Sequence, residues 1–323
     1  MAAAQPSFAT IRLVTRLAVP CTLDGALAGR RERDFLDALI LMAVVQANVG
    51  PIMRDPALQR AYAGADEPPP DELRRPVSVN AVAHSLRLPY ETVRRRIARL
   101  AAAGACEASA AGIIVPAREL ATPEHTLALM AVWDQIRRLY LVLRDHGLID
   151  EMLSRSEGEL WVANAAEPPL RAVIRVASDY LLRTIDSITR HLGGMIPGII
   201  WFAILRANTE DLPVTDGGGP TPNLVDFIAD SRRRPVSVVE IARRLGAPHE
   251  TVRRYVAGLV ADGLCRRVRG GLIVPADVLA RPAAVKVMRH NFADLQRMFT
   301  GFARLGVLAD WDRQAPTRRA GAA

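Results

Sequence analysis

The sequence predicts a mainly helical protein with small β-hairpins, built as two tandem units with flanking helices. Two observations support this fold class. Residues 74–120 align without a gap to residues 233–279, with 25 identities in 47 positions. Within each block, apolar residues recur first at the spacing of helices and then at the spacing of strands. Because the block is duplicated, we expect the same elements to form twice.

The likeness between the two copies continues, more weakly, beyond these blocks. Residues 44–48 (VVQAN) match residues 204–208 (ILRAN) after a slip of one position, and RLVTRLA at 12–18 matches RAVIRVA at 171–177. Each half of the chain is long enough to bury a core of its own. The predicted domains are residues 1–150 and residues 151–323.

Each unit has the same predicted order of elements around its block. An apolar helix comes first, a polar loop rich in proline or glycine follows, and a long amphipathic helix closes the unit. The loop of the second unit, TDGGGPTPN, lacks the Gly-Lys-Ser/Thr of a phosphate-binding loop, so we interpret it as a connection. The predicted apolar helices span about 34–49 and 196–208, and the closing helices span about 123–146 and 282–305.

The block of the second copy begins with two short predicted helices. Ser237 is the expected N-cap of the first, with Glu240 three residues later as its capping-box partner, and Gly246 ends it. The second helix begins near His249. Its buried face consists of residues at helical spacing, Val252, Val256 and Leu259, whose counterparts in the first copy are Val93, Ile97 and Leu100.

After the second helix, CRRVRGGLIVP predicts a strand, a Gly-Gly turn and another strand. Helix, turn, helix and hairpin form the winged helix-turn-helix arrangement, whose second helix enters the major groove of DNA. The segments PHETVRRYVAGLVADGLCRRVRGG and PYETVRRRIARLAAAGAC resemble the DNA-binding domains of the Crp/Fnr and GntR families of bacterial transcription regulators. The resemblance covers the 47-residue block of each copy and implies a sequence-specific regulator that binds double-stranded DNA.

The resemblance also assigns the residues that read bases. Glu91 and Glu250 stand where these families accept a hydrogen bond from cytosine, and Arg95 and Arg254 stand where an arginine reads guanine. The chemistry agrees, because a guanidinium matches the O6/N7 edge of guanine and a carboxylate suits the N4 amine of cytosine. The other predicted base-reading residues are Tyr90, Arg94, His249 and Arg253.

Contacts to phosphate are expected from both recognition helices and from one wing. Thr92 and Thr251 lie near helix N-termini, which favour phosphate. The first recognition helix adds Arg96 and Arg99, and we expect these to compensate in part for its wing, CEASAAG, which carries no cation. The second wing, CRRVRGG, carries Arg266, Arg267 and Arg269. The two copies are therefore predicted to form a pseudo-dimer that reads related but unequal half-sites.

Composition agrees with an anionic partner. The net charge is +8 and the isoelectric point is about 10.2, and all but one (Lys286) of the 42 basic residues are arginine. We expect double-stranded DNA rather than a membrane, since no apolar run is long enough to span a bilayer. The cysteines lack the spacing of a disulfide framework or a zinc site, so they favour a cytoplasmic, nucleoid-associated protein in which Cys106 and Cys265 are small buried side chains.

The sequence predicts neither an enzyme nor a cofactor or metal site. The six histidines are scattered, and no nucleophile motif is present. No effector site stands out. We expect the flanking helices to pack the units on each other, with homodimerisation as the alternative. Two other functions stay open, a plasmid-type replication initiator with two winged helices and a winged-helix scaffold that binds proteins.

Overall fold

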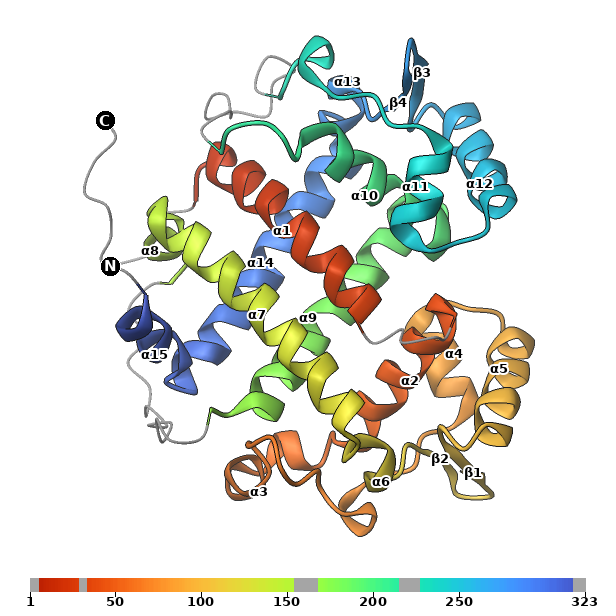
Figure 1. Ribbon diagram of the computed structural model, residues 1–323, viewed down its shortest axis with the longest axis vertical. Coiled ribbons are helices and arrows are strands. Elements are labelled where there is room, and N and C mark those ends of the chain that lie inside the picture. Colours follow the sequence, from red (N-terminus) through yellow and green to blue (C-terminus); the bar gives the residue numbers. More distant parts are fainter. Residues whose placement is uncertain (1–5, 29–33, 154–167, 215–226, 316–323) are drawn as a thin grey trace. The chain divides into compact units, whose positions relative to one another are not determined.

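The computed structural model describes residues 6–28, 34–153, 168–214 and 227–315. These residues are mainly helical and include two small antiparallel hairpins (Figure 1). The predicted class, a mainly α protein with small β-wings, is thereby confirmed. The predicted connection TDGGGPTPN lies outside the described residues. Contacts between residues group the chain into two compact units.

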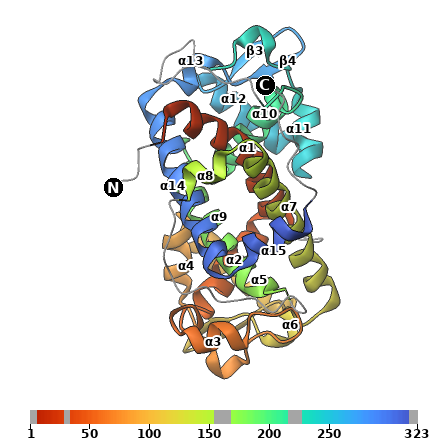
Figure 2. The same cartoon turned by 90° about the vertical axis from the view of Figure 1, so that its left-hand side faces the viewer.

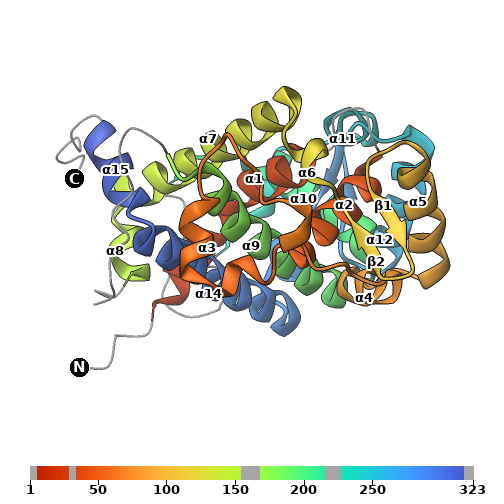
Figure 3. The same cartoon turned by 90° about the horizontal axis from the view of Figure 1, so that it is seen from below.

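The first unit comprises the described parts of residues 24–149, 155–183 and 295–323. Helices α4 (Val79–Leu86) and α5 (Tyr90–Ala102) are followed there by the hairpin β1–β2 (Glu107–Ser109 and Gly112–Ile114), and we call these elements the first module. Figure 3 shows the hairpin beside α5. The other elements that lie wholly in this unit are α2 (Phe35–Asn48), α3 (Pro56–Ala61), α6 (Ala117–Leu120), α7 (Pro123–Asp145), α15 (Val307–Gln314) and the 3-10 helices Ile52–Arg54 and Asp71–Leu73.

The second unit comprises the described parts of residues 1–23, 150–154 and 184–294. Its second module consists of α11 (Val238–Leu245), α12 (His249–Ala261) and the hairpin β3–β4 (Arg266–Val268 and Gly271–Ile273). Figure 2 shows α10 (Met195–Thr209) close to α11 and α12. The unit also holds the 3-10 helix Asp230–Arg232 and α13 (Ala276–Leu279). Helices with residues in both units are α1 (Phe8–Ala28), α8 (Leu148–Met152), α9 (Leu170–His191) and α14 (Pro282–Arg304).

Each of the two compact units consists of segments from both halves of the sequence, so the units do not coincide with the two copies of the repeat. The predicted domain boundary near residue 150 therefore stays a prediction. The predicted flanking helices are confirmed to within one residue at each end, as α2, α10, α7 and α14. Among the described residues, no single helix is long and apolar enough to cross a membrane, although α9 and α10 pass the same test as a bent pair.

Local sequence signals explain the helices of the second module. The Ser237 hydroxyl accepts a hydrogen bond from the backbone N–H of Glu240 at 3.1 Å, which is the predicted N-cap. The Glu240 carboxylate pairs instead with Arg234 and Arg244. Gly246 ends α11 at a φ of 53°, a left-handed conformation that glycine adopts readily. The predicted buried stripe of α12 is confirmed: Val252, Val256 and Leu259.

The first module is built in the same way, with one difference at the turn between its helices. The stripe of α5, Val93, Ile97 and Leu100, is buried against α4 and β2. Arg87 stands where the second module has Gly246 and takes a φ of 52°, a conformation that costs an L-residue free energy. The two cysteines that follow the recognition helices, Cys106 and Cys265, are buried as predicted, and burial raises the pKa of the Cys265 thiol to about 12.

A buried asparagine fixes each hairpin to the helix that precedes its module. The side-chain amide of Asn48 donates to the carbonyls of Arg75 and Ile113, and its Oδ1 accepts from the N–H of Val115. The equivalent partners of Asn208 are Arg234, Leu272 and Val274, at 2.7, 3.1 and 2.8 Å. Because all the polar atoms of the buried amide are paired, each asparagine holds its wing in one orientation.

A long helix near the start of each half of the sequence, α1 or α9, packs in part in the unit that holds the other half's module. The first part of α1 lies in the second unit, where Nη2 of Arg16 donates to the carbonyls of Leu212 and Pro213 at 2.6 and 3.0 Å. The first part of α9 lies in the first unit, where Nη2 of Arg175 donates to the carbonyl of Tyr62 at 2.5 Å. Each unit therefore includes part of a helix from the opposite half of the sequence.

Candidate nucleic-acid interface

Helix α12 of the second module exposes one polar face in its first two turns. His249, Glu250, Arg253 and Arg254 are exposed there, and Thr251 is half-buried. The opposite face carries the buried stripe, so α12 cannot turn another face outward without uncovering its core. The structure thus brings the predicted base-reading residues of this module together on one accessible surface.

Charged contacts order this face of α12. Oε1 of Glu250 accepts a hydrogen bond from Nη2 of Arg253 at 2.6 Å, and this bond holds the pKa of Glu250 below its ordinary value. The Arg254 guanidinium lies over the ring of Tyr255, 5.4 Å from its centroid. Glu250 is thus an ionised acceptor at neutral pH. Because an exposed ion pair contributes little stability, Arg253 can exchange its carboxylate for a DNA partner at low cost.

The hairpin β3–β4 forms the wing of the second module, and its turn differs from the prediction. Val268 pairs with Gly271, so the turn consists of Arg269 and Gly270 and not of two glycines. Gly271 has a φ of 150°, and a Cβ at this position would lie 2.5 Å from the carbonyl oxygen of Val236. The second glycine therefore allows the close approach of the Val236 backbone, and Arg269 lies at the tip of the wing.

The three arginines of this wing are not equivalent. Arg267 and Arg269 are exposed, and neither forms a hydrogen bond or an ion pair with another described residue. Arg266 donates from Nη1 to Asp230 at 3.0 Å and from Nη2 to Asp277 at 3.2 Å. Two of the predicted phosphate contacts therefore have uncommitted guanidinium groups, and the third is held by carboxylates.

Helix α5 of the first module presents a similar polar face. Tyr90, Glu91, Arg94 and Arg95 are exposed, and Thr92 is half-buried. Nε of Arg94 lies 3.0 Å from Oε2 of Glu91, which matches the pair on α12. Nε of Arg95 donates to the backbone carbonyl of Glu91 at 3.3 Å. The predicted base-reading residues of the two modules thus occupy corresponding exposed positions.

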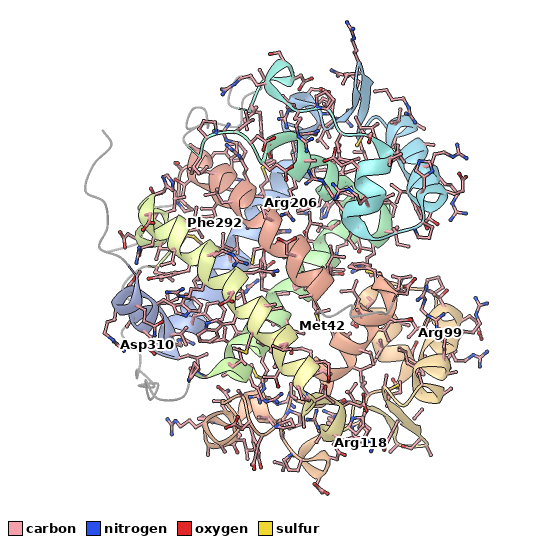
Figure 4. The ribbon with its side chains drawn as sticks, in the orientation of Figure 1. Met42, Arg99, Arg118, Arg206, Phe292 and Asp310 are labelled. Atoms are coloured by element: carbon pink, nitrogen blue, oxygen red, sulfur yellow. The ribbon has the colours of Figure 1, made fainter. Side chains whose placement is uncertain are left out.

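Arg96 and Arg99 of α5 contact acidic residues at the start of α2 (Figure 4, where Arg99 is labelled). Nη1 of Arg96 donates to Asp34 at 2.8 Å and to Asp37 at 2.7 Å, and Arg99 also donates to Asp37. Asp37 is only 4% exposed, while Asp34 caps α2 by accepting from the N–H of Leu36. These ion pairs occupy the two arginines within the first unit, and their contact with phosphate stays a prediction.

The two wings carry one ion pair with its charges exchanged. Glu107 on β1 pairs with Arg118 at 2.7 Å, and Arg266 on β3 pairs with Asp277 at 3.2 Å. Residues 107 and 266 correspond in the repeat, as do residues 118 and 277. Figure 4 labels Arg118. The contact is thus kept while the sign of the charge on the wing is reversed.

Sequence reasoning misses the carboxylates that hold these predicted DNA contacts, Asp37, Asp230 and Asp277. Two signals point to them. Asp37 is an acidic residue near the start of an otherwise apolar helix, and such a charge needs a partner when it is buried. The reversal of charge between residues 107 and 118 and residues 266 and 277 is visible once the two copies are aligned.

The arrangement defines a class of protein. In the second module, a tight turn joins a first helix to a second helix whose exposed face carries Glu250, Arg253 and Arg254. A basic hairpin follows, as in a winged helix-turn-helix DNA-binding domain. The family model of the IclR helix-turn-helix domain matches residues 223–269, which include α11, α12 and β3. The chain thus contains a DNA-binding domain of the kind that transcription regulators use.

This match refines the predicted relationship. The resemblance to the Crp/Fnr and GntR families is not confirmed, because the matching domain model is of the IclR type. A helix-turn-helix domain of this type binds DNA and is not catalytic, which fits the prediction that the chain is not an enzyme. Comparison with curated proteins and with solved structures finds no match.

Proposed function

We propose that the protein is a sequence-specific transcription regulator that reads double-stranded DNA with two winged helix-turn-helix modules on one chain. The single observation that carries this proposal is the exposed recognition face of α12 beside a wing with two uncommitted arginines, Arg267 and Arg269. A helix in the major groove and a cationic wing on the backbone are the two contacts that such a domain makes with DNA.

Repeated contacts support the first module as a second DNA reader. Before each module a buried arginine donates to a carbonyl, Arg74 to Pro69 and Arg233 to Ile228. In both copies an aspartate before the module also accepts from the N–H that opens the helix after the wing, and these pairs are Asp71 with Ala117 and Asp230 with Ala276. Such detailed equivalence is the expected result of a tandem duplication, with the units at residues 1–150 and 151–323. Two recognition helices on one chain then act as a pseudo-dimer, and the second contact with DNA becomes intramolecular.

The two modules are proposed to contribute unequally. Glu250 and Arg254 of the second module read bases, with His249 and Arg253 beside them, while Thr251 and the wing arginines contact phosphate. Glu91 and Arg95 of the first module read bases in the same way, with Tyr90 and Arg94 beside them and Thr92 at a phosphate. Arg96 and Arg99 reach phosphate when DNA displaces them from Asp37.

Two separate substitutions, Arg95→Ala and Arg254→Ala, test this proposal on a site selected from random duplexes. We expect each to cost about 1–3 kcal/mol of binding free energy and to relax base preference in a different half-site. Arg60→Ala, which removes the same charge from α3 outside both modules, is the matched control and should leave the footprint unchanged. Unchanged affinity and unchanged salt dependence in both interface variants would show that neither helix reads DNA.

Binding across the genome separates the regulator from the alternative functions. Sites scattered among promoters support transcription regulation, whereas one cluster of iterated repeats would identify a replication initiator. A protein-interaction scaffold would make no phosphate contacts, so its assay with random duplex DNA would show no steep salt dependence.

A further inference from the structure

The second unit contains a pocket between α1, the end of α10 and the segment that leads into the second module. Its walls are mostly apolar and include Leu205, Phe227 and Met288, while Arg12, Arg16 and Arg233 also line it. The empty volume is about 580 Å³, with solvent at the open mouth included. Apolar walls with a few polar groups are typical of pockets that bind small organic molecules.

One guanidinium group of this pocket, that of Arg233, is buried and has a donor without an acceptor among the described residues. Arg233 is 4% exposed, donates from Nη2 to the carbonyl of Ile228 at 2.9 Å, and has its Nε 3.5 Å from Oδ1 of Asp230. Its Nη1 is buried and donates to none of the described residues. The desolvation of the guanidinium lowers the pKa of Arg233 to about 10, and nearby Arg16 adds to this effect. An anion beside Nη1 would compensate this burial.

We propose that this pocket binds a small organic carboxylate with an apolar body, whose carboxylate bonds to Arg233 and whose body contacts Leu205, Phe227 and Met288. The apolar walls exclude a bare inorganic anion as the best occupant, because such an ion would leave that surface without a partner. The buried guanidinium excludes a neutral hydrocarbon, because the unpaired donor would stay unpaired. One ligand class satisfies both parts of the pocket.

The pocket is joined to the wing through Asp230. This aspartate is close to Arg233 through Oδ1 and accepts from Arg266 on β3 through Oδ2, at 3.0 Å. When a ligand carboxylate pairs with Arg233, Asp230 pairs with Arg266 alone. The stronger Asp230–Arg266 ion pair then holds this wing arginine away from phosphate. This second step rests on the proposed DNA-binding function and predicts that the ligand weakens DNA binding.

The first unit provides a matched comparison. Arg74, Arg171 and Arg175 correspond to the three pocket arginines, and they donate to backbone carbonyls of Pro69, Ala65, Leu120 and Tyr62. Nη1 of Arg74 is buried without a described partner, as is Nη1 of Arg233, so the two copies differ at the wing and not at this donor. The residue that corresponds to Arg266 is Glu107, which an aspartate cannot hold by an ion pair. We therefore place the link to the wing in the second unit alone.

Isothermal titration of the full chain with octanoate and with benzoate tests the site without DNA. We expect at least one of them to bind at one site per chain. Acetate and 1-octanol should bind with an affinity lower by about tenfold or more. Arg233→Gln should weaken binding by about tenfold or more, and Arg74→Gln should not change it. If Arg233→Gln unfolds, Leu13→Trp decides, since it narrows the pocket at a partly exposed position and keeps all three arginines.

Several results would overturn the site. They are no binding of either carboxylate, equal binding of octanoate and 1-octanol, or unchanged binding in both pocket variants. The link to the wing is tested by DNA affinity with and without the carboxylate. We expect a several-fold loss in the natural chain and none in Asp230→Asn, and an equal loss in both would overturn the link. If the chain fails to bind DNA at all, the proposed function is wrong, while the titration still decides the pocket.

Discussion

The two modules share a recognition sequence but differ in where their arginines are bound. In the first module, Arg96 and Arg99 contact Asp37, and the wing carries Glu107 in place of a cation. In the second module, Arg267 and Arg269 are exposed and uncommitted. The comparison teaches that an arginine count alone does not measure the capacity to bind phosphate, because intramolecular carboxylates neutralise part of it.

The exchanged ion pair between each wing and the helix after it shows how such a difference arises without a change of fold. The Glu107–Arg118 and Arg266–Asp277 pairs make the same contact with opposite polarity. Shape is preserved because the contact is preserved, while the electrostatic potential of the wing changes sign. Two copies of one fold can thus have different partners on the same element.

The largest expected effect comes from removing the uncommitted wing charges. Arg267→Ala/Arg269→Ala removes two phosphate contacts, so the slope of log affinity against log salt should fall by about 2 and affinity by roughly tenfold or more near physiological salt. Fluorescence anisotropy over a salt series measures both. The matched variant that adds charge is Ala108→Arg/Ala110→Arg, at the corresponding positions of the first wing. It should steepen the slope of log affinity against log salt by a similar amount. An unchanged slope in the loss variant would contradict the role of the wing.

A smaller effect is expected from releasing the arginines of the first module. Asp37→Asn removes the carboxylate that Arg96 and Arg99 share, so both become available to phosphate and the salt slope should rise by about 1 to 2. The same anisotropy series measures this gain. Asp34→Asn is the control, because Asp34 contacts Arg96 but not Arg99 and should produce at most half of it. Weaker DNA binding in Asp37→Asn would mean that the ion pairs position α5 for DNA.

A third contrast concerns acid stability. Glu210 and Glu240 of the second unit share Arg234 and Arg244, and these bonds lower the pKa of both carboxyl groups below the ordinary value of 4.5. The stability that a lowered carboxyl pKa contributes is fully present above about pH 4.5 and is lost as pH falls through the lowered pKa. Glu240→Gln should therefore cost about 1 kcal/mol at pH 7 and less at pH 3.

Thermal unfolding of the natural chain and of Glu240→Gln at both pH values measures this difference. The first module has Ala81 and Ser85 where the second has Glu240 and Arg244, so it lacks this network of ion pairs. A substitution at Ala81 is therefore the control for Glu240→Gln. An equal loss of stability at pH 7 and pH 3 would show that the carboxylate charge contributes nothing.

The smallest effect is expected at the turn between the two helices of each module. Gly246→Arg places in the second module the residue that the first already has, and should cost about 1 kcal/mol because of the left-handed backbone. Arg87→Gly should stabilise the first module by up to about 1 kcal/mol. Melting temperatures measure both changes. Shifts in the same direction for the two variants would exclude backbone strain as their cause.

Much of the fold could be predicted from the sequence because its signals are local. The N-cap at Ser237, the end of α11 at Gly246 and the apolar stripe of α12 each depend on a few neighbouring residues. The exposed face of α12 follows from that stripe, because the two faces of one helix are opposite each other. The duplication extends these predictions to the first copy, and the equivalent bonds of Asn48 and Asn208 agree with the aligned sequence.

Features that depend on distant residues could not be predicted. The pairing of Arg96 and Arg99 with Asp37 joins residues about 60 positions apart, and local patterns do not report such contacts. The turn at Arg269 and Gly270 differs from the predicted Gly-Gly turn because Gly271 lies against Val236, which forms an isolated bridge to Leu272 before α11. The packing of part of α1 in the second unit and of part of α9 in the first has no local signal at all.

This exchange of helices has a consequence for the order in which the protein folds during synthesis. The first module emerges from the ribosome long before α9, yet Arg171 and Arg175 of α9 bond to Ala65, Leu120 and Tyr62 beside that module. These bonds cannot form until α9 itself is made. A gene shortened to the first copy would therefore leave those three carbonyls without their arginine partners.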